Sequence, residues 1–484
     1  MPGAVNSTEQ AGWQPPAAEQ WRKLLFLVAL GCAIYWLWPR PEEISPQGWR
    51  LFAIFASTIC GLMLRPLPVG VLVLISLTVC ALTGALELRE ALSGYANPVV
   101  WMVLSAFLIS RALIKTGLAR RIALMFVRVF GRSSTGISFS LILSDVTLAT
   151  IIPSNTARAG GVILPIARGL AELYGSSPGK TAGLLGAFLM TSVYQGECVA
   201  AAMFLTGHAG NPLVAGFARD IAGVEVSWAS WALAGIVPGA VSILGIPFLV
   251  SRLVPLEIKS TPKAAAFAAS EIDKMGPVDS AQKIVLAVFL LVCGLWLTAS
   301  LHGLSVALVA MGGACVLFLS GVLTWEDAIT ERHAWDVFVW YGGVVRLGGA
   351  LNDYGVTEVF AKSVGSSLSS VGWVLLLAAT LLIYFYAHYG FASSTMHLVS
   401  MFPPFVALLV ARGAPAGLVV YGFGCLAGLS AGLTHYGTVP APMFFSQDYV
   451  SLRTWWKVGY VVSVWNVVVW CSVGFAWWKL VGVW

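Results

Sequence analysis

The sequence consists largely of long apolar runs, most of them about twenty residues in length and separated by short polar connections. A run of this length crosses a bilayer as one α-helix, whereas a membrane barrel would show strands of about ten residues with alternating polarity. Such alternation is absent from the sequence. Charged residues form only 10% of the chain, against about 25% in an ordinary soluble domain. The sequence therefore predicts an all-α polytopic membrane protein and argues against a soluble enzyme.

The apolar runs predict about eleven transmembrane helices and two re-entrant hairpins. The hairpins are expected at about 135–173 and 371–412, because both stretches carry small polar residues at their centres. Non-helical backbone at membrane depth must be buried in protein or line a cavity. The full spans are expected at 24–39, 50–64, 67–86, 97–118, 181–220 (broken near 207–212), 227–251, 283–300, 303–322, 336–358, 415–447 (broken near 437–442) and 456–482.

Four regions follow from this layout. Residues 1–23 read as a disordered tail, 24–251 as a first repeat with the inner hairpin, 252–282 as a cytoplasmic linker, and 283–484 as a second repeat with the outer hairpin. The net charge of +6 arises mainly in the connections on one side, which predicts a cytoplasmic N-terminus and an outside C-terminus. It does not indicate binding to nucleic acid. We expect a bacterial inner (plasma) membrane protein.

Short motifs recur in the two halves at a nearly constant offset. Five full spans separate the hairpin tips, and this odd number inverts the second copy relative to the first. Paired broken elements in an inverted repeat are typical of the binding site of a secondary transporter. The matched motifs are SNT at 154–156 with SST at 393–395, ALIKTG at 112–117 with ALNDYG at 350–355, and, more loosely, TGHAGNP at 206–212 with YGTVPAP at 436–442.

The hairpin tips have the composition of an anion site. Each break begins a half-helix, whose N-terminus presents free backbone N–H groups and a partial positive charge. Such ends bind anions, and Ser, Thr and Asn add side-chain donors. The alternative is a Ser/Thr kink within a continuous spanning helix. The candidate substrate-binding residues at the tips are Ser154, Asn155, Thr156, Ser393, Ser394 and Thr395.

Two basic residues lie beside these breaks. Arg158 follows the first tip, and an arginine at membrane depth tends to mark a substrate path or a paired charge. His208 follows the glycine of the first broken span. We expect both to offset the charge of an anionic substrate. The alternatives are that Arg158 pairs with Asp145 or Glu197, and that His208 is satisfied within the core.

Several runs resemble the divalent anion–sodium symporter family. They are PSNTARAGG at 153–161, TGHAGNP at 206–212, and GLTHYGT at 432–438 with PAP at 440–442. The resemblance extends over nearly the whole chain and is greatest to the citrate/succinate and tartrate/succinate antiporters and the chloroplast 2-oxoglutarate/malate translocators. It implies eleven spans, two hairpins, a homodimer, and an elevator in which a transport domain slides against a scaffold domain.

The resemblance also implies a function and further site residues. It assigns the tip motifs to substrate carboxylates and adds Gly207, His208 and Thr438 at the breaks. Ser394 stands where sodium-coupled members usually have Asn. We therefore expect antiport of di- or tricarboxylates of the succinate, malate, tartrate, citrate and 2-oxoglutarate class, with a sodium-coupled symporter as the alternative. The expected partners are these substrates, membrane lipid and a second copy of the chain.

An enzyme or metalloprotein is not expected. Clustered His/Asp/Glu or Ser/Lys constellations are missing from the sequence, and its eight cysteines are scattered without a CxxC or Cys/His cluster. The sequence thus predicts neither a cofactor nor a metal, nor a catalytic residue.

Overall fold

The computed structural model describes residues 17–367 and 370–484. Apart from one isolated bridge between Ser133 and Ser260, the regular structure in these residues is helical. Within them, eight helical segments are long and apolar enough to cross a membrane by length and composition. Three shorter apolar helices accompany them. The prediction of an all-α polytopic membrane protein is therefore confirmed.

Each range expected as a full span contains a helix, and most bounds differ by a few residues only. The helices are α1 (Ala18–Leu37), α2 (Pro46–Leu64), α3 (Val69–Leu82), α5 (Pro98–Lys115), α10 (Gly186–Met203) with α11 (Asn211–Ala222), α12 (Trp228–Leu253), α14 (Ser280–Leu297), α16 (Val306–Leu319), α18 (Arg332–Asp353), α22 (Ala416–Leu429) with α23 (Pro440–Phe445), and α24 (Leu452–Val469) with α25 (Phe475–Leu480). Short helices connect some of them: α4 (Leu88–Ala91), α15 (Ala299–His302) and α17 (Trp325–Thr330).

The N-terminal helix starts earlier than expected. The tail was expected to reach residue 23, but α1 begins at Ala18. Glu19 and Lys23 form an ion pair of 2.8 Å across one turn, which supports the helical conformation of this polar segment. The rest of the expected tail, residues 1–16, lies outside the described residues.

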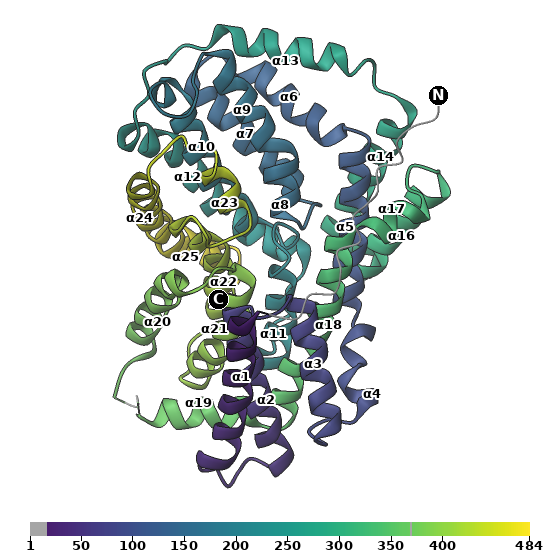
Figure 1. The fold of residues 1–484 in the computed structure, drawn as a ribbon, viewed down its shortest axis with the longest axis vertical. Helices are drawn as coiled ribbons and strands as arrows, with labels where there is room; N and C mark the ends of the chain where they lie inside the picture. The colour runs from purple at the N-terminus through teal and green to yellow at the C-terminus, as the bar shows by residue number, and fades with distance from the viewer. Residues whose placement is uncertain (1–16, 368–369) are drawn as a thin grey trace.

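Both ranges predicted for hairpins contain a broken pair of helices. The first has one arm in α7 (Ser134–Ala149) and the other in α8 (Asn155–Arg158), the π-helical turn η2 (Ala159–Ile163) and α9 (Leu164–Leu173). The second is formed by α20 (Trp373–Ala387), the 3-10 turn η4 (His388–Gly390) and α21 (Ser394–Ala411). In Figure 1 the first hairpin descends from the top of the molecule with α8 near its centre.

Three helices lie in segments that the sequence predicts as connections between spans. They are α6 (Leu118–Phe130), α13 (Pro262–Lys274) and α19 (Val356–Ser367). The expected linker 252–282 thus contains a helix, which crosses the top of the molecule above α6, α7 and α9 (Figure 1). Arg120 on α6 pairs with Glu271 on α13 at 2.7 Å. The sequence pattern did not predict these helices, because an amphipathic surface helix lacks the continuous apolar run of a spanning helix.

Two left-handed glycines account for one of the sequence repeats. Gly117 ends α5 with a φ of 74°, and Gly355 ends α18 with a φ of 71°. A residue with a side chain is strained in this conformation, so glycine is the usual residue where a helix ends in this way. The motifs at 112–117 and 350–355 therefore mark equivalent helix ends in the two halves.

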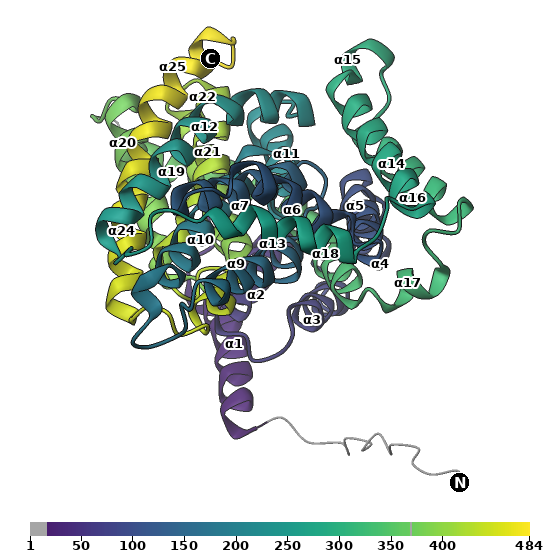
Figure 2. The same cartoon turned by 90° about the horizontal axis from the view of Figure 1, so that it is seen from above.

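The helix α10 forms the centre of the core. Each of its residues from Gly186 to Met203 is buried, and it packs against α7, α12 and α22. Seen from above, α14 and α16 lie on one side of the molecule and α24 and α25 on the opposite side (Figure 2). The polar residues Tyr194, Gln195 and Glu197 of α10 are thus enclosed by protein.

Candidate functional site

The first hairpin tip is an interrupted helix with a serine cap. The backbone of Ser154 is extended, with φ −100° and ψ 99°, and its Oγ accepts a hydrogen bond from the N–H of Ala157 at 3.1 Å. The Oδ1 of Asn155 accepts from the N–H of Thr156 at 3.0 Å. Asn155 and Thr156 are half-buried, whereas Ser154 is buried. A simple kink in a continuous helix is thereby excluded here.

The second tip repeats this construction. Ser393 is also extended, with φ −157° and ψ 124°, and its Oγ accepts from the N–H of Met396 at 3.4 Å. Ser394 and Thr395 are buried in the first turn of α21. Both tips therefore present a capped helix N-terminus that begins in the interior, as the motif repeat predicts.

The two breaks in the spanning helices are closed by side chains. Thr206 donates from Oγ1 to the carbonyl of Thr150 at 2.7 Å, which ties the first break to the end of α7. Asn211 donates from Nδ2 to the carbonyls of Ala201 and Phe204, both at 2.8 Å. These bonds satisfy carbonyls that the interrupted helix leaves without partners.

The second break uses a threonine. The Oγ1 of Thr438 accepts from the N–H of Ala441 at 3.3 Å and lies 3.3 Å from the hydroxyl of Tyr194 on α10. Pro440 begins α23, a position where its missing N–H costs nothing. Thr438 therefore lies where the second break meets the core helix that also carries Glu197.

His208 connects the first break to the second tip. Its Nδ1 accepts a hydrogen bond from the N–H of Gly210 at 3.1 Å. Its Nε2 lies 3.0 Å from Oγ of Ser394 and 3.4 Å from Oγ1 of Thr395. A nitrogen that accepts from a backbone N–H carries no proton, so this arrangement fits a neutral imidazole with its proton on Nε2. We expected His208 to carry a positive charge, but this geometry fits an uncharged ring. The reason is that the loop at the break directs the N–H of Gly210 toward Nδ1.

Arg158 takes up the paired arrangement that the sequence left open. Its Nε donates to Oδ1 of Asp145 at 2.9 Å, and its Nη1 donates to the carbonyls of Ile152 and Gly207 at 2.7 and 2.8 Å. Its Nη2 lies 3.9 Å from Oε1 of Glu197. The side chain is fully buried, so the guanidinium ties the first tip to the first break rather than facing open space.

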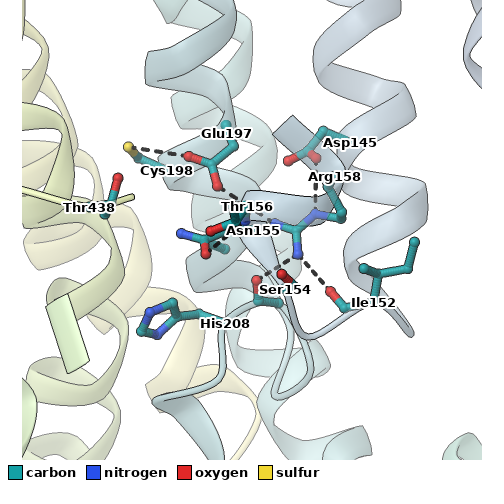
Figure 3. A network of polar contacts seen from close by, with 12 residues as sticks. Asp145, Ile152, Ser154, Asn155, Thr156, Arg158, Glu197, Cys198, His208 and Thr438 are labelled. Atoms are coloured by element: carbon teal, nitrogen blue, oxygen red, sulfur yellow. Dashed lines mark hydrogen bonds and ion pairs between the residues drawn. The ribbon is translucent and has the colours of Figure 1, made fainter. Parts of the chain in front are cut away.

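These contacts bring the two tips together. Arg158 binds the carbonyl of Gly207. The next residue, His208, lies near the first tip in Figure 3 and contacts Ser394 of the second tip. In the same view Asn155 and Glu197 appear between Thr438 and Arg158. The candidate residues of both repeats thus surround one place in the interior, and Asn155 and Thr156 are the half-buried members at the first tip.

The sequence did not single out three polar side chains that hold the breaks. The Nε2 of His388 lies 3.1 Å from the carbonyl of Gly437. Tyr194 donates to the carbonyl of Ala431 at 2.8 Å, and Gln195 to that of Gly432 at 2.9 Å. Tyr194 and Gln195 could have been singled out from the sequence, because they are adjacent polar residues within the apolar run of α10. Within the part of the chain that the structure describes, no group of three or more His, Cys, Asp or Glu residues is placed to hold a metal ion.

Two capped tips and two broken helices that meet inside an all-α polytopic chain define a membrane transporter of the inverted-repeat class. The chain belongs to the family described as the sodium:sulfate symporter transmembrane region, which it matches over residues 18–484. The family resemblance expected from the motifs is thereby confirmed.

The chain is similar to named transporters over nearly its whole length. It is 42% identical to the "Putative malate transporter YflS" of Bacillus subtilis, across 95% of this chain and 96% of that relative. It is 39% identical to "Dicarboxylate transporter 1, chloroplastic" of Arabidopsis thaliana, across 98% of this chain and 85% of that relative. The structure of the Alcanivorax borkumensis YdaH transporter has a similar fold, with a TM-score of 0.51 at 15% identity, covering 96% of this chain and 99% of that one.

Proposed function

We propose that the protein exchanges small di- or tricarboxylates across the membrane, with one substrate carboxylate at each hairpin tip. The observation that carries the proposal is the pair of capped helix N-termini, since each offers free N–H groups and hydroxyl donors to an anion. The names of the relatives, a malate transporter and a dicarboxylate transporter, support the same substrate class. Succinate, malate, tartrate, citrate and 2-oxoglutarate are the candidates.

The proposed substrate site comprises both tips and both breaks. Hydroxyl and amide groups of the tips bind the carboxylates, while Gly207, His208 and Thr438 line the space between them. Arg158 acts by holding the first tip to the first break, since its donors already meet Asp145 and two carbonyls. The tip residues are Ser154, Asn155, Thr156, Ser393, Ser394 and Thr395.

Sodium is not needed in this proposal. Carbonyl oxygens are ordinary ligands for a hard cation, and the guanidinium of Arg158 already lies on the carbonyls of Ile152 and Gly207. The guanidinium therefore occupies two carbonyl oxygens that a sodium ion could otherwise use as ligands. When a tip without substrate crosses the membrane, its N–H and hydroxyl donors have no partners, and burying them in this state costs free energy. Return with a second anion avoids that cost, and this favours exchange.

The wider architecture follows from the family resemblance. We propose a homodimer in the inner membrane with a cytoplasmic N-terminus and an outside C-terminus. The first hairpin then opens from the cytoplasm and the second from outside. Transport proceeds by an elevator motion of the domain that carries the hairpins.

Uptake of radiolabelled succinate into proteoliposomes tests the function. Uptake is expected only with succinate or malate inside the vesicles, and it is expected to persist when choline replaces sodium on both sides. Uptake that needs a sodium gradient and no internal substrate would identify the symporter instead. Protein-free liposomes and vesicles with the double variant Ser154→Ala/Ser393→Ala serve as controls.

A further inference from the structure

A buried carboxylic acid whose contact with Arg158 is longer than a hydrogen bond lies beside the first tip. Glu197 on α10 is 2% exposed, and it faces Asp145 on α7 and Arg158 on α8. Cys198 and Tyr194 of its own helix and the amide of Asn155 also lie around it. Figure 3 shows Glu197 next to the tip, above Thr156 and Asn155.

The hydrogen bonds of Arg158 are directed at other groups. Three of its N–H donors meet Asp145 and the carbonyls of Ile152 and Gly207. Its Nη2 stays 3.9 Å from Glu197, too far for a hydrogen bond. Arg158 Nη2, Glu197 Oε1 and Asp145 Oδ2 all have no hydrogen-bond partner among the described residues. The other oxygen of Glu197 lies 3.9 Å from the thiol of Cys198, which is a weak donor, and the uncharged amide of Asn155 is its other polar neighbour.

The charges of this cluster do not balance. One guanidinium faces two carboxyl groups, and all three side chains are at most 2% exposed. The bonded pair of Arg158 and Asp145 is neutral as a unit. A second carboxylate would be a buried negative charge without a counterion, which costs several kcal/mol by general estimates. His208 does not compensate for it, because its Nδ1 accepts a hydrogen bond from Gly210.

We infer that Glu197 is a proton-binding site of the transporter, and that a proton on Glu197 and a substrate carboxylate at the first tip favour each other's binding. The step is an acid–base equilibrium in which the carboxylate takes one proton from a hydronium ion, so that one O–H bond forms on Glu197, one breaks in hydronium, and a water molecule is released. Asn155 and Thr156, which lie next to Glu197 in Figure 3, are half-buried rather than buried.

The coupling follows from like-charge repulsion. A carboxylate of the substrate at the capped tip lies close to Glu197 and is repelled by it when Glu197 is ionised. Protonation removes that repulsion, and by reciprocity the bound anion holds the proton more tightly. Couplings of this kind typically change affinity by about 5- to 150-fold. The coupling, though not the proton site itself, rests on the proposed dicarboxylate function.

Infrared spectroscopy tests the proton site without substrate. Purified protein in a detergent without ester groups is expected to show a protonated-carboxyl C=O band at neutral pH. The band should be lost in Glu197→Gln and in Glu197→Met. Glu172→Gln is the matched control, because Glu172 is exposed and paired with Arg168 at 2.8 Å. Absence of the band in the unmodified protein, or its persistence in Glu197→Gln, would overturn the proposal.

Succinate binding from neutral to alkaline pH tests the coupling, because succinate is fully ionised throughout this range. Affinity of the unmodified protein is expected to fall at least about fivefold, in line with the lower end of such couplings. Glu197→Gln, which mimics the protonated acid, should bind with little dependence on pH. Parallel pH profiles for both proteins would overturn the coupling. Absence of succinate binding at every pH, with the infrared band present, would reject the proposed function and leave the proton site in place.

Discussion

The two hairpin tips are built alike where they face the interior and differently behind it. Ser154 and Ser393, at an offset of 239 residues, cap their helices in the same way. The same offset relates Arg158 to His397 and Asp145 to Tyr384. In the first half these partners form an ion pair at 2.9 Å, and in the second their rings pack with centroids 4.3 Å apart.

The contrast extends to the breaks. The carbonyl of Gly207 receives Nη1 of Arg158 at 2.8 Å, and the carbonyl of Gly437 lies 3.1 Å from Nε2 of His388. A guanidinium and an imidazole thus occupy comparable places. The donors offered to a ligand are shared by the two repeats, whereas the support behind them is ionic in one half and aromatic in the other. This difference predicts unequal sensitivity to substitution.

The largest difference in stability is expected between the variants Arg158→Met and His397→Phe. Loss of Arg158 leaves buried carboxyl groups without their cation, a change that typically costs about 3–5 kcal/mol. Replacing His397 by a ring of similar shape keeps the packing and is expected to cost less than about 1.5 kcal/mol. Thermal unfolding in mild detergent measures both. The double variant Arg158→Met/Asp145→Leu should recover most of the loss, and equal damage from both single changes would break the comparison.

Substitution of the capping serine is expected to have the same effect at both hairpin tips. Ser154→Ala and Ser393→Ala are each expected to lower stability by about 1 kcal/mol through loss of an N-cap. Each should also weaken succinate binding about tenfold or more, because a hydrogen bond to a charged group contributes about 1.5–3 kcal/mol. Titration calorimetry on the two variants measures the second effect. A binding defect confined to one tip would contradict the two-fold site, and Ser446→Ala, on the exposed end of α23, is a control.

The smallest effect is expected for Tyr384→Phe. The hydroxyl of Tyr384 is buried and has no hydrogen-bond partner among the described residues, so its removal leaves no group unsatisfied. We expect a change in stability within about 0.5 kcal/mol, the usual range for a substitution that breaks no specific interaction. The melting temperature of the variant beside that of Asp145→Leu measures the contrast. A large loss of transport at unchanged stability would instead assign the hydroxyl a role in the transport cycle.

Much of the fold could be predicted because a bilayer constrains the sequence strongly. Runs of about twenty apolar residues located the spans, and the Ser-Asn-Thr and Ser-Ser-Thr motifs located both tips. The helices α6, α13 and α19 were not predicted. Each mixes polar and apolar residues and therefore lacks the continuous apolar run that marks a spanning helix. The orientation of Arg158 stayed open, because spacing along the chain does not tell which of two nearby carboxyl groups an arginine meets.

Other parts of the site depend on contacts between distant segments. The contact of His208 with Ser394 joins residues 186 positions apart, and the local sequence holds no trace of it. The same is true of Tyr194, whose hydroxyl reaches the second break from the first repeat. A neutral histidine could be inferred only after the N–H of Gly210 was seen to face its ring.

The complete burial of α10 has a consequence for biogenesis. This helix is not among the eight described segments apolar enough to span on their own, and it carries Gln195 and Glu197 near its middle. A charged residue at the centre of a helix costs about 2.5–3.5 kcal/mol during insertion by the translocon. The helix gains its stability from α7, α12 and α22, and α12 and α22 are synthesised after it. Nascent α10 therefore has to be retained beside the insertion machinery until later helices enclose it.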